Sequence, residues 1–523
     1  MSDHQTPPAE YTALLAWDPT TANPGDALQR LGMLIDAATE RGDPEGLRRA
    51  ITIAPGIRER LSKPANQARL FYFVGNAWSE LQRRRPAATE RIWEWEQPEC
   101  EQAILAYRTA INTHGFNALK PVEQSRLLTN LANLLDHLGR TIEAIRYWDR
   151  ALQITPGFGM ARANRALGLT SYARHLYDNG HKGVFYKTAH AEFTTALTEN
   201  LESHAITGIT AARDHITELL TPEYLANPLH LDDYPLGSTT EEQEYRRRLL
   251  NARLFLNPLN DLGPHPIAAR DILSTPPIVV KAGSGPTYQG FMNQLKQEFV
   301  GARYLYDQGT HDRTPHYADR GVLLTDTMDY PSYGLRTEYL RTSFRLAYSL
   351  LDKTAYFLND YLGLNIPETQ VSFRGLWYTK NKANLGLRPE FTSRENLPLR
   401  ALYWLAKDLA PTEEVAGTLE PDAQALASIR NHLEHKYCKL HIEGFLSPEP
   451  SRASGMLADT MALSMNRLTF EKKCRHLLRL ARASIIYLAL AIHREEQERA
   501  TTRPPTDRIA SIRLDRLPDA DTR

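Results

Sequence analysis

The sequence predicts an all-α protein in which an array of helices is followed by a second helical domain. Apolar residues recur at helical spacing along most of the chain, and an internal repeat is visible in its first half. From about residue 221 to 286, frequent prolines interrupt this pattern. With 523 residues, 42% of them hydrophobic, the chain is long enough for two to four domains and at least one large core.

Charge and cysteine usage limit the classes of function. The formal net charge is 0, so no global field draws the protein onto nucleic acid, and any such contact must come from local patches. Three cysteines, an odd number, favour a reducing compartment over a disulfide framework. The N-terminus lacks an apolar signal core, and the longest apolar run, residues 485–492, is too short to span a bilayer. We therefore expect a cytoplasmic protein with no membrane contact.

Residues 12–220 contain the repeat, which is clearest over residues 125–156. Small residues there let two antiparallel helices approach, large ones fill the space between them, and a glycine marks the turn. These positions are Leu131, Ala132, Gly139, Ala144, Trp148 and Ala151. Weaker copies have the spacing of Ala103, Tyr107 and Ala110 and of Ala189, Phe193 and Ala196.

This spacing resembles the tetratricopeptide repeat, a helix-turn-helix unit of roughly 34 residues. The resemblance implies a stack of at least three units whose concave face binds a peptide or protein. An irregular helical bundle is the alternative, since only one unit is clear. The proline-rich residues 221–285 are predicted to be a linker or docking segment, with one short strand over residues 276–286.

Residues 286–499 are predicted to form the second domain, a helical bundle. A loop-rich stretch at residues 371–394 has a possible hairpin near Asn381 and Asn384, and the tail, residues 500–523, has a disordered composition. Helices are expected over about residues 291–306, 340–362, 396–409, 421–442 and 457–499.

The fourth of these helices carries a short polar cluster. On a helical wheel, Asn431 and His435 are neighbours on one flank, and Arg430 stands at its edge, whereas His432 turns away. The opposite, apolar arc is formed by Leu426, Ile429, Leu433, Tyr437 and Leu440. The polar flank therefore faces solvent, a substrate or a partner subunit.

These residue types suit the cleavage of RNA without a metal ion. An imidazole exchanges protons near neutral pH, so His435 is a candidate general acid or base. The guanidinium of Arg430 can bind phosphate oxygens and stabilise the charge of the transition state. Asn431 can orient either group by hydrogen bonding. In that reaction the 2′-hydroxyl of RNA attacks the adjacent phosphate.

Arg430, Asn431 and His435 resemble the Arg-Asn-x-x-x-His motif of one branch of the HEPN superfamily (higher eukaryotes and prokaryotes nucleotide-binding). The resemblance covers about residues 286–499. It implies a metal-independent endoribonuclease with no cofactor, and a homodimer in which two motif helices face each other. The coupling to tetratricopeptide-like repeats is also similar to known members, many of which are toxins in prokaryotic antiviral defence.

Other readings of the motif remain open. Arg430 and Glu434 can form a pair on an exposed helix, with His435 merely solvated. The protein could instead be a repeat-based adaptor with a dimerising or nucleotide-binding bundle, or the partner or substrate of a nucleotidyltransferase. A zinc site would use His432, His435, Cys438 and His441, but on a straight helix these advance by about 60° per step and cannot all face one ion.

A basic stripe on the last helix is a candidate RNA-binding surface. Lys472, Arg475, Arg479 and Arg482 share one face there, with His476 beside them. Such a stripe could hold RNA phosphates near the motif. The alternative is a solvated face without a ligand.

Overall fold

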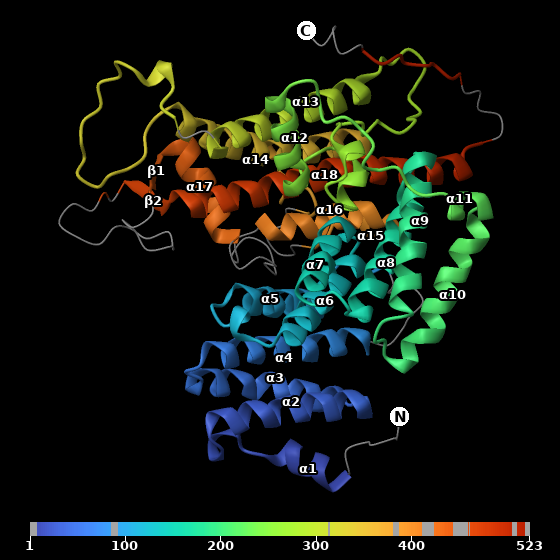
Figure 1. Ribbon diagram of the computed structural model, residues 1–523, viewed down its shortest axis with the longest axis vertical. Helices are drawn as coiled ribbons and strands as arrows, with labels where there is room; N and C mark the ends of the chain where they lie inside the picture. Colours follow the sequence, from blue (N-terminus) through green and yellow to red (C-terminus); the bar gives the residue numbers. More distant parts are fainter. Residues whose placement is uncertain are drawn as a thin grey trace.

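The computed structural model describes residues 8–84, 93–311, 314–379, 386–409, 423–442, 459, 461–504 and 510–517. Helices dominate these residues, which contain a single two-stranded sheet, so the predicted all-α class is confirmed. Figure 1 shows a stack of helices from the N-terminal half beneath a layer of longer helices from the C-terminal half.

The N-terminal helical stack consists of helices that pack mainly against their neighbours in sequence. Six of them begin with a proline in the first turn, where its missing N–H costs no hydrogen bond. Their bounds are α1 (Pro8–Ala16), α2 (Pro24–Arg41), α3 (Pro44–Arg60), α4 (Pro64–Arg83), α5 (Pro98–Asn112), α6 (Pro121–His137), α7 (Thr141–Ile154), α8 (Gly159–His175), α9 (Asn179–Ala196) and α10 (Ser203–Leu219).

The α6–α7 pair corresponds to the clearest predicted repeat. The large and small residues that were expected between its helices, Leu131, Ala132, Ala144, Trp148 and Ala151, are all buried. Gly139 lies in the turn with φ of 90°. The N–H groups of Gly139 and Arg140 donate to the carbonyls of Asp136 and Leu135, both at 2.8 Å, which satisfies the end of α6.

Replacing Gly139 with alanine is expected to destabilise the protein by about 1–3 kcal/mol. A Cβ at this positive φ is strained and would lie 2.6 Å from the backbone oxygen of Leu397, in the C-terminal layer. A lower melting temperature in differential scanning fluorimetry would show the effect. Gly157→Ala is the control, because a Cβ there meets no atom within 4 Å. Equal melting temperatures for the two variants would contradict this account of the turn.

The proline-rich segment docks onto both halves of the molecule. It contains α11 (Pro222–Ala226), α12 (Thr240–Ala252) and two 3₁₀ turns, Pro258–Asp261 and Pro266–Ala268. Apolar residues from this segment join a core that also includes side chains of the N-terminal stack and of the C-terminal layer. This segment therefore packs against both halves of the molecule. The strand predicted over residues 276–286 is wrong, since these residues have no regular secondary structure before α13 begins.

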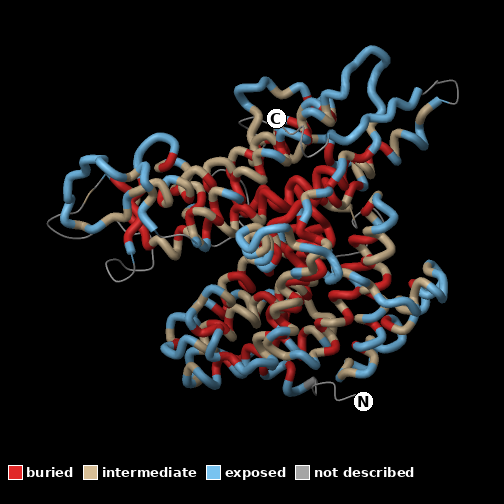
Figure 2. Tube along the Cα trace, turned by 45° about the horizontal axis from the view of Figure 1, so that its top comes forward, coloured by how far each residue is buried: buried red, intermediate tan, exposed pale blue. Residues whose placement is uncertain are grey.

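The C-terminal layer is organised around one long helix, α18 (Arg467–Thr502), which packs against α13, α14 and α16. By length and composition α18 is apolar enough to cross a membrane, but 83% of its most apolar window is buried inside the protein, as in the core helix of a soluble domain. Buried residues run through both the stack and this layer (Figure 2). The other elements are α13 (Thr287–His311), α14 (Leu335–Tyr361), α15 (Pro389–Thr392), α16 (Leu397–Ala406), the 3₁₀ turn η8 (Lys407–Leu409), α17 (Ala423–His435), β1 (Tyr437–His441) and β2 (Ala462–Asn466).

Two predicted helix boundaries are wrong at this sheet. The motif helix ends at His435 rather than near Ile442, and the last helix begins at Arg467 rather than near residue 457. Residues 437–441 and 462–466 form β1 and β2, which pair in parallel from Tyr437↔Ala462 to His441↔Asn466. Pairing with a distant segment overrides local periodicity here.

Two further predictions fall partly on residues that the structure does not describe. The suggested hairpin near Asn381 and Asn384 lies outside the described residues, although Tyr378 and Leu387 on either side form an antiparallel bridge. The tail predicted to be disordered, residues 500–523, begins within α18, which extends to Thr502. Its residues 510–517 have no regular secondary structure.

Candidate functional site: the end of helix α17

The structure places the polar cluster on the outward side of α17. Leu426, Ile429 and Leu433 are buried, whereas Asn431 and His435 are exposed and Arg430 is half-buried. These positions agree with the helical wheel. Tyr437 and Leu440, expected on the same apolar arc, lie instead on β1, and Tyr437 is exposed.

Arg430 is held between its own helix and α14. Its Nη1 donates to Oδ1 of Asn431 at 3.3 Å, and its guanidinium carbon lies 5.5 Å from the ring centroid of Tyr348. Burial raises the pKa of the Asp352 carboxyl, one turn further along α14, and the positive charge of Arg430 opposes that rise. The guanidinium of Arg430 is therefore positioned by Asn431 on its own helix and by an aromatic ring of a neighbouring helix.

The last turn of α17 is anchored by Arg345 of α14. Its Nη2 and Nε donate to the carbonyl of Leu433 at 2.5 and 3.1 Å, and a cation at a helix C-terminus also stabilises the helix dipole. The N–H of Lys436 donates to the carbonyl of His432. His435, the final residue of α17, is therefore presented by a fixed turn. His432 is half-buried and hydrogen-bonds the carbonyl of Ser428 at 2.8 Å.

A second arginine of α14 fixes the start of the strand that follows. Nη2 of Arg341 donates to the carbonyl of Cys438 at 2.7 Å. None of these supporting residues is among those predicted from the sequence. Their signal is a polar flank on α14 at intervals of three and four residues, formed by Arg341, Arg345, Tyr348 and Asp352.

The basic stripe predicted on the last helix is divided between surface and core. Lys472 is exposed and Arg475 is half-buried. Arg479 donates to a backbone carbonyl at the end of α12 at 2.9 Å, and burial lowers its pKa to about 9. Arg482 is only 2% exposed and pairs with Asp261 at 2.6 Å. RNA contact by Arg482 is therefore a wrong prediction, because this side chain fixes the proline-rich segment to the core, and Arg479 has the same structural use.

The four residues of the alternative zinc set do not share one element. His432 and His435 end α17, whereas Cys438 and His441 lie on β1. Positions 438 and 441 of a strand point to opposite faces. Burial also raises the pKa of the Cys438 thiol to about 12, which disfavours the thiolate that zinc binds.

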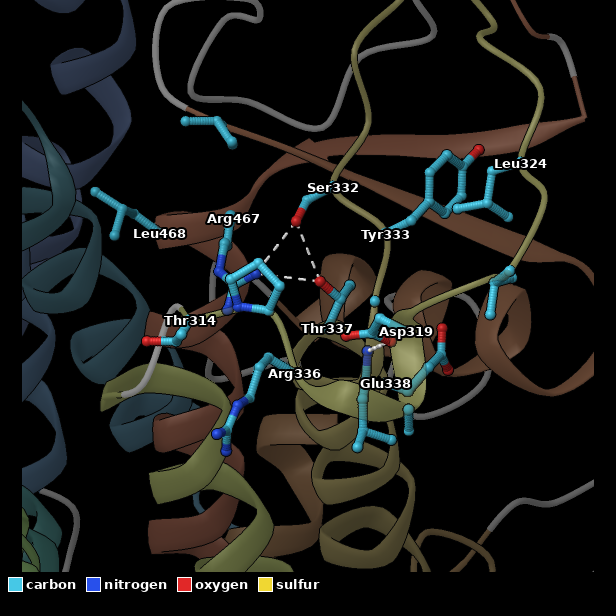
Figure 3. Close-up of a pocket in the computed structure, with 16 residues that line it drawn as sticks. Thr314, Asp319, Leu324, Ser332, Tyr333, Arg336, Thr337, Glu338, Arg467 and Leu468 are labelled. Carbon is cyan, nitrogen blue, oxygen red and sulfur yellow. Dashed lines mark hydrogen bonds between the residues drawn. The ribbon is translucent and has the colours of Figure 1, made fainter.

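Next to β1, a loop of residues 314–334 encloses a cavity of about 630 Å³ with the start of α14 and the start of α18 (Figure 3). Its polar groups satisfy one another. Arg467 donates to the hydroxyls of Ser332 and Thr337 at 3.3 and 3.1 Å, and a carboxylate oxygen of Asp319 accepts the N–H of Leu335 at 2.8 Å. The cavity therefore offers an apolar wall rather than an anion site, formed by Pro315, Ala318, Val322, Leu324, Tyr333, Ile442 and Leu468.

Large apolar side chains continue outward from this cavity. We call them the apolar loop surface; Figure 1 shows the loop projecting from one end of the C-terminal layer, beside β1 and β2. Ten of the 24 exposed large apolar residues in the described part of the chain belong to it, so it is a concentrated feature. They are Tyr317, Val322, Leu323, Leu324, Met328, Tyr330, Tyr333, Tyr437, Ile442 and Met461.

Residues 279–495 match the family model described as LA2681-like HEPN. This match supports a HEPN superfamily domain in the C-terminal part of the chain. The match includes the motif helix, both strands and most of α18. No curated protein and no solved structure matches the chain.

Proposed function

We propose that the HEPN domain is a metal-independent endoribonuclease that uses Arg430, Asn431 and His435. The observation that carries the proposal is the gathering of these three side chains on one outward flank of α17, within the region that matches a HEPN family. Anchoring of that flank by Arg345 and Tyr348 supports it, since catalytic groups act best when their geometry is fixed in advance.

The proposed reaction needs one base, one acid and a site for negative charge. The base removes the proton of the 2′-hydroxyl, whose oxygen attacks the adjacent phosphorus. The acid protonates the departing 5′-oxygen, leaving a 2′,3′-cyclic phosphate. His435 from each of two subunits supplies these proton transfers, Arg430 binds the phosphate oxygens, and Asn431 orients Arg430 through their hydrogen bond.

This scheme requires a homodimer through the C-terminal domain. The apolar loop surface supports such a contact, because a concentration of exposed apolar side chains is typical of a protein–protein interface. Leu323, one of its residues, is 98% exposed. The surface continues onto Tyr437, two residues from His435, so a second subunit bound there lies beside the motif.

The biological role we propose is a regulated toxin or antiviral effector acting in the cytoplasm. The N-terminal helical stack, with its tetratricopeptide-like spacing, would be the module that binds a protein or peptide signal. Two ion pairs from the stack to η8, Arg108–Asp408 and Lys407–Glu101, give that signal a route toward α17, which packs against η8.

Two observations favour a non-catalytic alternative, a repeat-based adaptor with a dimerising or nucleotide-binding bundle. The net charge is 0, and the structure removes Arg479 and Arg482 from the predicted RNA-binding stripe. An adaptor of this kind would bind its partners without cutting RNA.

Cleavage under chelation separates the two proposals. We expect the purified full-length protein to cut total RNA and tRNA in excess EDTA, leaving a cyclic phosphate or its hydrolysis product at the mapped ends, and to have the mass of a dimer by light scattering. Metal-dependent cleavage would contradict the mechanism. No cleavage with or without Mg²⁺ would favour the adaptor.

A further inference from the structure

A second cavity, of about 420 Å³, lies between α13 and α14. Its volume is within the roughly 300–1,000 Å³ that is usual for small-ligand sites. Its lining includes Phe291 and Gln294 of α13 and Ser349, Asp352, Lys353 and Tyr356 of α14. The function proposed above assigns no role to this cavity.

Asp352 belongs both to this cavity and to the surroundings of the motif. Its carboxylate lines the cavity, and Arg430 is close enough to act on its charge. The N–H of Phe373 donates to Oδ1 at 3.0 Å, which fixes the orientation of the carboxylate. No other hydrogen bond to Asp352 occurs among the residues that the structure describes, so Oδ2 and one lone pair of Oδ1 remain for a ligand.

The aromatic residues give the cavity a stacking wall. The rings of Phe291 and Tyr356 are nearly parallel, with an interplanar angle of 14° and centroids 6.1 Å apart. The hydroxyl of Tyr356 donates to Glu368 at 2.8 Å, which holds the ring in place while it stays 38% exposed. Proteins that bind single-stranded RNA stack unpaired bases on such rings.

The polar groups of the cavity mainly accept hydrogen bonds. One amide N–H of Gln294 donates to Glu298 at 2.7 Å, and the amide oxygen accepts no hydrogen bond from the described residues. Lys353 is also bound by Glu298, at 2.6 Å. A base that matches the site must therefore present donors on its edge. Guanine does so with two adjacent groups, N1–H and the 2-amino group, whereas adenine, cytosine and uracil each present one donor group there.

We propose that this cavity binds a guanine of single-stranded RNA next to the cleaved phosphate, with the base on Tyr356 and its N1–H and 2-amino groups on the Asp352 carboxylate. The inference rests on the proposed ribonuclease function for the identity of the polymer. It adds what that function leaves open, the base at which the RNA is cut.

Binding can be measured without cleavage in the full-length His435→Ala protein, by fluorescence anisotropy of labelled octauridine RNAs with guanosine, inosine, adenosine or uridine at one central position. We expect the guanosine RNA to bind about 10-fold more tightly than the adenosine and uridine RNAs, with inosine, which lacks the 2-amino group, between them. Equal binding of the four RNAs, or binding of none, would overturn the proposal.

Two substitutions test the contacts, each with a matched control and a melting temperature. Asp352→Asn should abolish the guanosine preference, whereas Asp360→Asn, two turns further along α14 and outside the cavity, should retain it. Tyr356→Leu should weaken the binding of all four RNAs about 10-fold. Tyr304 is an exposed tyrosine on α13, and Tyr304→Leu should leave the binding unchanged. A preserved preference in folded Asp352→Asn would overturn the assignment of the base edge.

Three further outcomes distinguish a failure of the guanine site from a failure of the ribonuclease function on which it rests. If the wild type cuts RNA with no preference for guanosine at the cleaved site, the inference fails and the ribonuclease stands. If the wild type does not cut but the guanosine preference is present, the ribonuclease fails and the cavity stands. Displacement of RNA by GMP at a lower concentration than by the guanosine RNA would assign the cavity to a free nucleotide and overturn the RNA proposal.

Discussion

Replacing His435 with alanine is expected to lower RNA cleavage by about 10²–10⁴-fold, the usual contribution of a general acid or base, and by more if both subunits depend on it. The side chain is exposed, and no described residue hydrogen-bonds it, so the melting temperature should not change. The measurement is the initial rate on a labelled single-stranded RNA under chelation, with both proteins at equal concentration of dimer.

The control is His432→Gln, three residues away on the same helix. His432 is half-buried, bonds a backbone carbonyl and turns away from the polar flank, so this variant should keep most of its activity. A rate for His435→Ala within a few-fold of wild type would exclude His435 from the reaction. Loss of activity in His432→Gln but not in His435→Ala would assign the acid–base chemistry to His432 and contradict its assignment to His435.

Much of the helical fold could be predicted because its signals are local. Helix starts coincide with a proline in the first turn or with an Asn or Asp cap, as at Asn23 and Asp43. The flank of α17 that carries Asn431 and His435 follows from the 3.6-residue period alone. These features depend on residues within one or two turns of each other.

What could not be predicted depends on partners far along the chain. Residues 437–441 have helical periodicity, yet they form β1 because residues 462–466 and Pro331 pair with them. Arg482 has the sequence pattern of a surface residue, but in the structure it forms a buried ion pair with Asp261. Arg345 likewise becomes part of the site only through its contact with Leu433, 88 residues away.

One buried carboxylate joins the two halves of the molecule. Asp408 of η8 accepts from Arg108 of α5 at 2.7 Å and from Arg140 of the α6–α7 turn at 2.5 Å. Arg140 also donates to Glu143, which accepts the hydroxyl of Tyr487 of α18 at 2.5 Å. Burial alone would raise the pKa of Asp408, but the two arginines outweigh it and hold that pKa far below its usual range. Asp408 is therefore ionised in the folded protein.

Asp408→Asn should destabilise the protein by about 3–5 kcal/mol, because it removes the negative charge that two buried guanidinium groups share. Since the folded pKa is lowered, the stability that Asp408 contributes is complete at neutral pH and is lost only as the pH falls below about 4, the value for an unfolded aspartate. The difference in melting temperature should therefore be large at pH 7 and should shrink in acid.

Glu395→Gln, on an exposed carboxylate just before α16, is the matched control and should leave the melting temperature unchanged. If Asp408→Asn melts with the wild type at pH 7, the cluster does not hold the two halves together. Asp408→Asn also tests how RNA cleavage is regulated, since η8 packs against α17. If the helical stack controls the motif through this cluster, the surviving folded protein should cut RNA at a rate that no longer responds to the ligand of the stack.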